Sequence, residues 1–142
     1  MTDVFTGKAE HTIDAKGRVF IPAMYRVELG NTFVVAKGFS EPYLSIYPMS
    51  EWEALIAKID AIGMDQQTRH IKRYIMINST QTEMDAQGRI ILSKEYREFA
   101  NLSKNILLLG MGKTIEVWDA EAITEQMSEQ PDSLESILAM LS

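Results

Sequence analysis

The sequence predicts an α+β fold in which two copies of one small unit build a pseudo-twofold β-barrel with helices around it. Two observations carry this prediction. The segment Asp14–Ile21 returns 71 residues later as Asp85–Leu92, with the same turn residues and the same apolar pattern. Each copy is also a series of short β-rich runs about 40 residues long, which is too small to be stable alone, so two copies should share one core.

Each copy is expected to run strand, turn, strand, short helix, strand, loop, strand. In the first copy we expect strands at 9–13, 18–21, 33–36 and 43–47, and a helix at 23–28. In the second copy we expect strands at 89–92, 106–109 and 114–118, and a helix at 94–99. Gly17 and Gly88 suit a left-handed turn position. Pro22 fits a first helical position, and Ser93 fits an N-cap.

Two helices are expected between the copies. Ser50 and Glu53 form an S-x-x-E capping box that starts the first helix. Its expected apolar face is Trp52, Leu55, Ile56, Ile59 and Ile62. Gly63 should end this helix and Asp65 should cap the next, which carries Arg69, Lys72 and Arg73. The expected division is a first unit at 8–50, linking helices at 51–78, a second unit at 79–122 and an acidic tail at 123–142.

The tail should open with a weak helix after Asp119 that fades around Pro131. A small apolar stripe follows near the end of the sequence, formed by Leu134, Ile137, Leu138 and Leu141.

Composition limits the possible functions. The chain has 142 residues, no cysteine and a formal net charge of −6. All 14 Lys and Arg residues lie before residue 114, and residues 114–142 carry seven acids and no Lys or Arg. The absence of cysteine excludes disulfides and thiolate metal sites. No apolar run approaches the ~20 residues that a membrane span needs, and the N-terminus shows no secretory pattern, so we expect a cytoplasmic protein without a membrane partner.

Enzyme chemistry is not expected. The two histidines, His11 and His70, share no motif, and no serine lies in a nucleophile elbow. Gly110–Thr114 resembles the end of a phosphate loop, but Leu107 stands where the first glycine of that motif belongs. A glycine-rich turn between two strands is the better interpretation. We therefore expect no cofactor and no metal.

The two Asp-x-x-Gly-Arg turns are the informative feature. Asp14 and Asp85 can accept hydrogen bonds from their own turn amides and hold the arginines that follow. The repeat then places Arg18 and Arg89 at related positions, with Lys16 in the first turn and Gln87 in the second. Guanidinium groups bind phosphates or the edge of guanine bidentately, and a two-stranded β-ribbon fits the DNA major groove. The turns therefore point to DNA as a partner.

These motifs resemble a known family. The residues that carry the resemblance are Phe5-x-Gly7, His11 to Arg18, Ile21-Pro22, Tyr25-Arg26, Tyr47-Pro48, Glu51-Trp52, Arg69, Arg73, Glu83 to Ile90 and Val117-Trp118. Together they resemble the MraZ family of bacterial transcriptional regulators, within the SpoVT-AbrB (AbrB-like) swapped-hairpin DNA-binding superfamily. The resemblance covers about residues 5–125. Ser93 departs from a proline common in the family, and Thr6 stands where some members have a basic residue.

The resemblance implies a nucleoid-associated, sequence-specific repressor without enzymatic activity. Such proteins bind direct repeats in the promoter of their own division and cell-wall gene cluster, and they assemble into homo-oligomeric rings, octamers or dodecamers. It implies DNA contact for Lys16, Arg18 and Arg89, while Asp14, Gly17, Asp85 and Gly88 shape the turns. Three alternatives stay open: a toxin-neutralising or metabolic binding module, a small enzyme and a structural scaffold. Lys8, Lys37 and the Arg69, Lys72, Arg73 run are better interpreted as solvated or interface residues than as DNA contacts.

Overall fold

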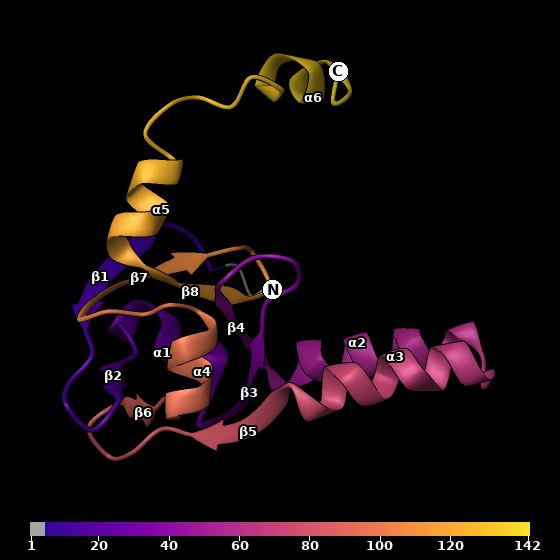
Figure 1. The fold of residues 1–142 in the computed structure, drawn as a ribbon, viewed down its shortest axis with the longest axis horizontal. Coiled ribbons are helices and arrows are strands. Elements are labelled where there is room, and N and C mark those ends of the chain that lie inside the picture. Colours follow the sequence, from indigo (N-terminus) through magenta and orange to yellow (C-terminus); the bar gives the residue numbers. More distant parts are fainter. Residues whose placement is uncertain (1–4) are drawn as a thin grey trace.

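The computed structural model describes residues 5–142 (Figure 1). The first four residues of the N-terminal stretch considered above lie outside this range. The first copy contains β1 (Lys8–Thr12), β2 (Arg18–Phe20), α1 (Ala23–Leu29), β3 (Thr32–Lys37) and β4 (Leu44–Pro48). The second copy repeats this order with β5 (Ser79–Glu83), β6 (Arg89–Ile91), α4 (Lys94–Phe99), β7 (Asn105–Gly110) and β8 (Ile115–Asp119). The expected duplication of secondary structure is thus confirmed.

The two copies are joined through their strands. A six-stranded antiparallel sheet has the order β1-β7-β8-β4-β3-β5, and a separate two-stranded sheet pairs β2 with β6. The first strand of each copy therefore pairs with the third strand of the other, since β1 lies on β7 and β5 lies on β3. Strands β1, β7 and β8 are equivalent to β5, β3 and β4 of the other copy. Replacing each strand by its equivalent reverses the strand order, so the sheet has the expected pseudo-twofold symmetry.

Strand sequence explains this arrangement. Val19 and Ile90 alternate with partly or fully exposed residues in the short β2–β6 ribbon, and both are at most 2% exposed. They pack into one core with Phe33, Ile46 and Leu108 from the large sheet and Tyr25 from α1. One apolar core is therefore built from both copies, as the small size of each copy requires.

The mixed α+β class is confirmed, while the closed barrel is not. Among residues 5–142, no hydrogen-bonded ladder joins the six-stranded sheet to the β2–β6 ribbon. The two sheets meet instead through the shared apolar core. Strands β2 and β6 contain only three residues each, which leaves little backbone for a further ladder.

Helices α2 (Met49–Ile62) and α3 (Gln66–Ile77) form a hairpin that projects from the sheets (Figure 1). The helix break at Gly63 is confirmed, and Asp65 caps α3 by accepting a hydrogen bond from the Thr68 amide at 2.8 Å. The predicted capping box is wrong: α2 begins at Met49 after Pro48, and no side chain caps it. Trp52 and Ile59 of the predicted apolar face are buried, whereas Ile62 is 73% exposed.

The structure also tests three further local predictions. Ser93 caps α4 by accepting from the Tyr96 amide, as predicted. Pro22 precedes α1 as its N-cap residue rather than forming its first turn. The glycine-rich segment after Gly110 is a turn that links β7 to β8, so the interpretation against a phosphate loop is confirmed.

The chain ends in two short helices. Asp119 caps α5 (Ala120–Gln126), which packs on β7 and β8 through Leu107, Trp118 and Ile123. The last helix, α6 (Leu134–Ala139), has no buried residue and stands clear of the sheets (Figure 1). None of the helices within residues 5–142 is long and apolar enough to cross a membrane.

Candidate nucleic-acid interface

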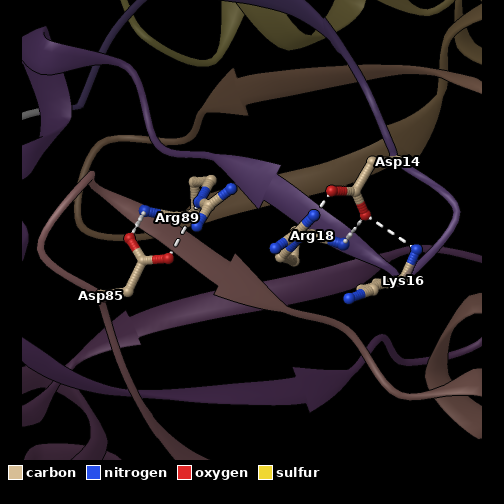
Figure 2. Close-up of polar contacts among 5 residues, drawn as sticks. All are labelled: Asp14, Lys16, Arg18, Asp85 and Arg89. Atoms are coloured by element: carbon tan, nitrogen blue, oxygen red, sulfur yellow. Dashed lines mark hydrogen bonds and ion pairs between the residues drawn. The ribbon is translucent and has the colours of Figure 1, made fainter.

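The two Asp-x-x-Gly-Arg turns have the same internal geometry. The Asp14 carboxylate accepts hydrogen bonds from the amides of Lys16 and Arg18, each at 2.9 Å, and from Arg18 Nε at 2.6 Å. The Asp85 carboxylate accepts from the amides of Gln87 and Arg89 and from Arg89 Nε, all at 2.9 Å. Each aspartate thus shapes its turn and also fixes the direction of the arginine that follows (Figure 2).

These contacts stabilise the ionised aspartates. The hydrogen bond from the Arg18 amide has the largest effect and lowers the pKa of Asp14 below its usual value; desolvation opposes it, and hydrogen bonds from the Arg18 side chain and the Lys16 amide lower the pKa further. The Arg89 amide and side chain, with the Gln87 amide, do the same for the pKa of Asp85. Both carboxylates are therefore charged at neutral pH and remain paired with their arginines.

The arginines come from different copies but lie on one surface. In the β2–β6 ribbon Arg18 pairs with Ile91 and Phe20 pairs with Arg89, with the buried Val19–Ile90 pair between them. Because strand side chains alternate, these four residues share the outer face of the ribbon. Figure 2 shows the two arginines near each other between the two flanking aspartates. We call Arg18, Phe20, Arg89 and Ile91 the ribbon face.

The ribbon face is accessible and mixed in character. The side chains of Arg18 and Arg89 are 31% and 22% exposed, while Phe20 and Ile91 are 44% and 65% exposed. The Arg89 guanidinium also lies 5.8 Å from the centre of the Phe20 ring. Each aspartate engages Nε, and the Nη nitrogens of both arginines make no hydrogen bond within residues 5–142. These groups can donate outward to a ligand.

The two turns interlock at their glycines. The Gly17 carbonyl accepts from the Leu92 amide at 2.8 Å, and the Gly88 carbonyl accepts from the Ile21 amide at 2.9 Å. Both glycines have positive φ, +81° and +80°. A Cβ on Gly17 would lie 2.6 Å from the Leu92 carbonyl oxygen, so glycine is required by backbone conformation and by contact with the other copy.

Arginines of α1 and α4 support the turns from behind. Arg26 Nε donates to the Ile21 carbonyl at 2.7 Å, and its guanidinium packs against Gly88 of the other copy. Arg97 Nε donates to the Leu92 carbonyl at 3.0 Å and packs against Gly17. Sequence reasoning assigned neither arginine a role, although the repeat of Tyr25-Arg26 as Tyr96-Arg97 was a signal.

The other candidate cations lie elsewhere. Lys16 is exposed in the first turn, beside Arg18 (Figure 2). Lys37 is occupied, because its Nζ lies 2.6 Å from Glu95 Oε2 and above the rings of Tyr96 and Phe99. Lys8 lies on edge strand β1. The cations of α3 lie on the projecting hairpin, apart from the ribbon face (Figure 1).

Sequence reasoning also missed the apolar half of the ribbon face. Phe20 and Ile91 were interpreted only as part of β-rich runs. The signal was the period of two, since Phe20 alternates with the core residues Val19 and Ile21. In the part of the chain that the structure describes, no three His, Asp or Glu side chains gather as metal ligands would.

These features define a class: a duplicated α+β protein that presents a two-stranded ribbon of aspartate-held arginines. The family model described as "MraZ protein, putative antitoxin-like" matches residues 4–74 and again residues 75–140. The chain belongs to the MraZ family.

Curated relatives agree with this assignment over nearly the whole chain. A protein of Carboxydothermus hydrogenoformans is 40% identical over 119 residues, which cover 83% of this chain and 82% of the relative. A protein of Thermoanaerobacter sp. is 36% identical and covers 92% of both chains. One of Halothermothrix orenii is 34% identical and covers 97% of this chain and 96% of its own. All three are named transcriptional regulator MraZ.

Proposed function

We propose that this protein is a DNA-binding transcriptional regulator that contacts the major groove through the ribbon face. The observation that supports this most strongly is the pair Arg18 and Arg89, which two separate aspartates hold on the outer face of one two-stranded ribbon. A two-stranded ribbon fits the B-DNA major groove, which is about 12 Å wide. The names of the relatives agree with a regulatory role.

The chemistry of the ribbon face favours base edges over phosphates. Each arginine is paired with an aspartate, so the two turns add little net positive charge. Their Nη groups still provide the fork that matches O6 and N7 of guanine. The apolar side chains Phe20 and Ile91 fit the methyl groups of thymine. Because the aspartates already hold the arginine side chains in place, ordering these side chains costs less conformational entropy on binding. Exposed Lys16 would add a phosphate contact beside Arg18.

Self-association completes the proposal. One ribbon only three residue pairs long makes few contacts, and the chain as a whole is acidic. A ring-shaped homo-oligomer, an octamer or a dodecamer, would present several ribbons to direct repeats in the promoter of its own division and cell-wall gene cluster. Linked contacts of this kind raise avidity ~10²–10⁴-fold over one site. The role would be that of a cytoplasmic, nucleoid-associated repressor.

The proposal also assigns a role to each segment of the chain. The units at 8–50 and 79–122 act as the two halves of a swapped-hairpin barrel, joined by the linking helices at 51–78. Asp14, Gly17, Asp85 and Gly88 shape the turns, and Lys16, Arg18 and Arg89 contact DNA. The acidic residues at 123–142 stay away from the duplex because both are negatively charged.

Fluorescence anisotropy with the duplex upstream of the protein's own gene tests this function. Loss of one bidentate base contact costs about 1–3 kcal/mol, so Arg18→Ala and Arg89→Ala should each weaken binding by about 5–150-fold. Lys113→Ala removes a positive charge from an exposed position on the β7–β8 turn and should bind within about twofold of the unaltered chain. A duplex with scrambled repeats, at the same salt concentration, reports the nonspecific part.

Two results would overturn the proposal. Equal loss of affinity in Arg18→Ala and Lys113→Ala would show that charge, and not the ribbon face, decides binding. Equal affinity of the unaltered chain for intact and scrambled duplexes would point to a scaffold or to a toxin-neutralising module, and capture of a co-encoded toxin would identify the latter.

A further inference from the structure

The α2–α3 hairpin carries a groove that nothing in the described chain covers. It has a volume of about 590 Å³ and runs from Asp60 and Met64 at the bend to Arg73 and Met76 on α3. Met64 is 78% exposed and Met76 is 46% exposed. An apolar floor open to water on a projecting hairpin is typical of a surface that binds another protein segment.

The rim of this groove is positively charged. Arg69, Lys72 and Arg73 line it, against the single carboxylate of Asp60. Lys72 Nζ pairs with that carboxylate at 2.8 Å, and Arg69 Nη1 donates to the Met64 carbonyl at 2.6 Å. The Arg73 side chain makes no hydrogen bond or ion pair with any residue in 5–142. The rim therefore favours an acidic partner.

The last helix of the chain has the complementary character. Ile137 and Leu138 of α6 are each 51% exposed and lie one turn after Leu134 on the same side of the helix, and Leu141, just beyond the end of α6, is 76% exposed. Residues 127–142 carry three acids, Glu129, Asp132 and Glu135, and no Lys or Arg. Isolated helices shorter than ~12–15 residues are marginal in water, so the six residues of α6 need a surface to pack on.

We propose that α6 of one copy of this chain docks in the α2–α3 groove of a second copy. The apolar stripe would cover Met64 and Met76, and the acids beside it would face Arg69 and Arg73. A partner copy is favoured over the same chain because α5 is anchored on β7 and β8, away from the hairpin (Figure 1). Seven residues, 127–133, join α5 to α6 and span at most about 25 Å.

Such a contact is head-to-tail, because each copy offers its tail to one neighbour and its groove to another. Contacts of this type close into a ring when the rotation between neighbours allows it. The inference rests on the self-association proposed above and is independent of DNA binding. It also leaves the ribbon face uncovered, since the groove lies on the hairpin (Figure 1).

Directed disulfide cross-linking tests the contact, and the absence of native cysteine makes the result unambiguous. Two differently tagged full-length chains, Met76→Cys and Leu138→Cys, are co-expressed and oxidised mildly. The matched control replaces Met76→Cys with Lys113→Cys, an exposed position on the β7–β8 turn. We expect the Met76–Leu138 pair to form a dimer carrying both tags at least tenfold faster than the control pair.

Charge reversal provides a second readout that does not depend on the new cysteines. In the cross-linking background, Arg73→Glu should slow formation of the two-tag dimer, and adding Glu135→Lys to the partner should restore most of the rate. Equal rates for the Met76 and Lys113 pairs would overturn the proposal. A Met76→Cys/Leu138→Cys chain that forms only an intrachain disulfide would also overturn it. The mass of the native oligomer, measured by light scattering, reports self-association separately from this contact, and anisotropy reports DNA binding.

Discussion

Replacing Gly17 with alanine tests how much the contact between the two copies at this glycine contributes to stability. At φ +81° an alanine is in the left-handed region, which costs about 1–2 kcal/mol for a residue with a Cβ. The new Cβ would also lie 2.6 Å from the backbone oxygen of Leu92, which cannot rotate away as a side chain would. Moving the two strands apart would break the hydrogen bond from the buried Leu92 amide to the Gly17 carbonyl, at a further cost of about 1–3 kcal/mol.

Gly112→Ala is the control. Its φ is +86°, and no atom lies within 4 Å of the Cβ position, so the substitution should cost only the backbone strain. We therefore expect Gly17→Ala to lose about 2–5 kcal/mol of unfolding free energy and Gly112→Ala about 1–2 kcal/mol. Chemical denaturation of both variants, followed by circular dichroism, measures the difference. Equal losses would refute the reasoning, because the contact between copies would then contribute nothing beyond conformation.

Three further predictions concern the turns, the contact of α1 with residues 6 and 7, and the ribbon. The pKa values of Asp14 and Asp85 are lowered in the folded chain, so their stabilisation is present above the usual value of 3.8 and is lost as pH falls through the folded pKa. The melting temperature of Asp14→Asn/Asp85→Asn should thus lie below that of the unaltered chain at pH 7, and the difference should shrink as the pH falls below 3.8; a constant difference would contradict this. Tyr25→Phe removes a hydroxyl that donates to the Thr6 carbonyl at 2.9 Å or the Gly7 carbonyl at 3.1 Å, and denaturation should show a loss of about 1 kcal/mol. Phe20→Ala should weaken specific DNA binding in anisotropy while leaving the melting temperature within about 3 °C; unchanged affinity would remove Phe20 from the interface.

The sequence predicted the repeated elements well, because the signals were local. Gly63 ended α2 and Asp65 capped α3 as expected, since both effects depend on a residue and its near neighbours. The capping box at Ser50 failed because Pro48 already sets the backbone for a helix that begins at Met49. The capping box therefore predicted correctly that a helix starts in this segment, but it placed the start after Ser50 and not at Met49.

The candidate site was less predictable, because it depends on pairing between copies. Sequence reasoning found Asp14, Arg18, Asp85 and Arg89 through the repeat. It did not show that β2 and β6 pair with each other, so that both arginines lie on a single ribbon. The register between two three-residue strands is set by the whole core, and a local pattern cannot specify it.

Protection of single cysteines by bound duplex tests the central claim most directly. Ala15→Cys and Ala86→Cys place a thiol in each exposed turn beside the ribbon face, and Lys58→Cys places one on exposed α2. Alkylation rates are compared with and without saturating duplex in the same oligomeric state. We expect duplex to slow alkylation of both turn thiols at least tenfold and to leave the α2 thiol unchanged. Turn thiols that react at the same rate in the bound protein would contradict the assignment of the ribbon face as the DNA contact.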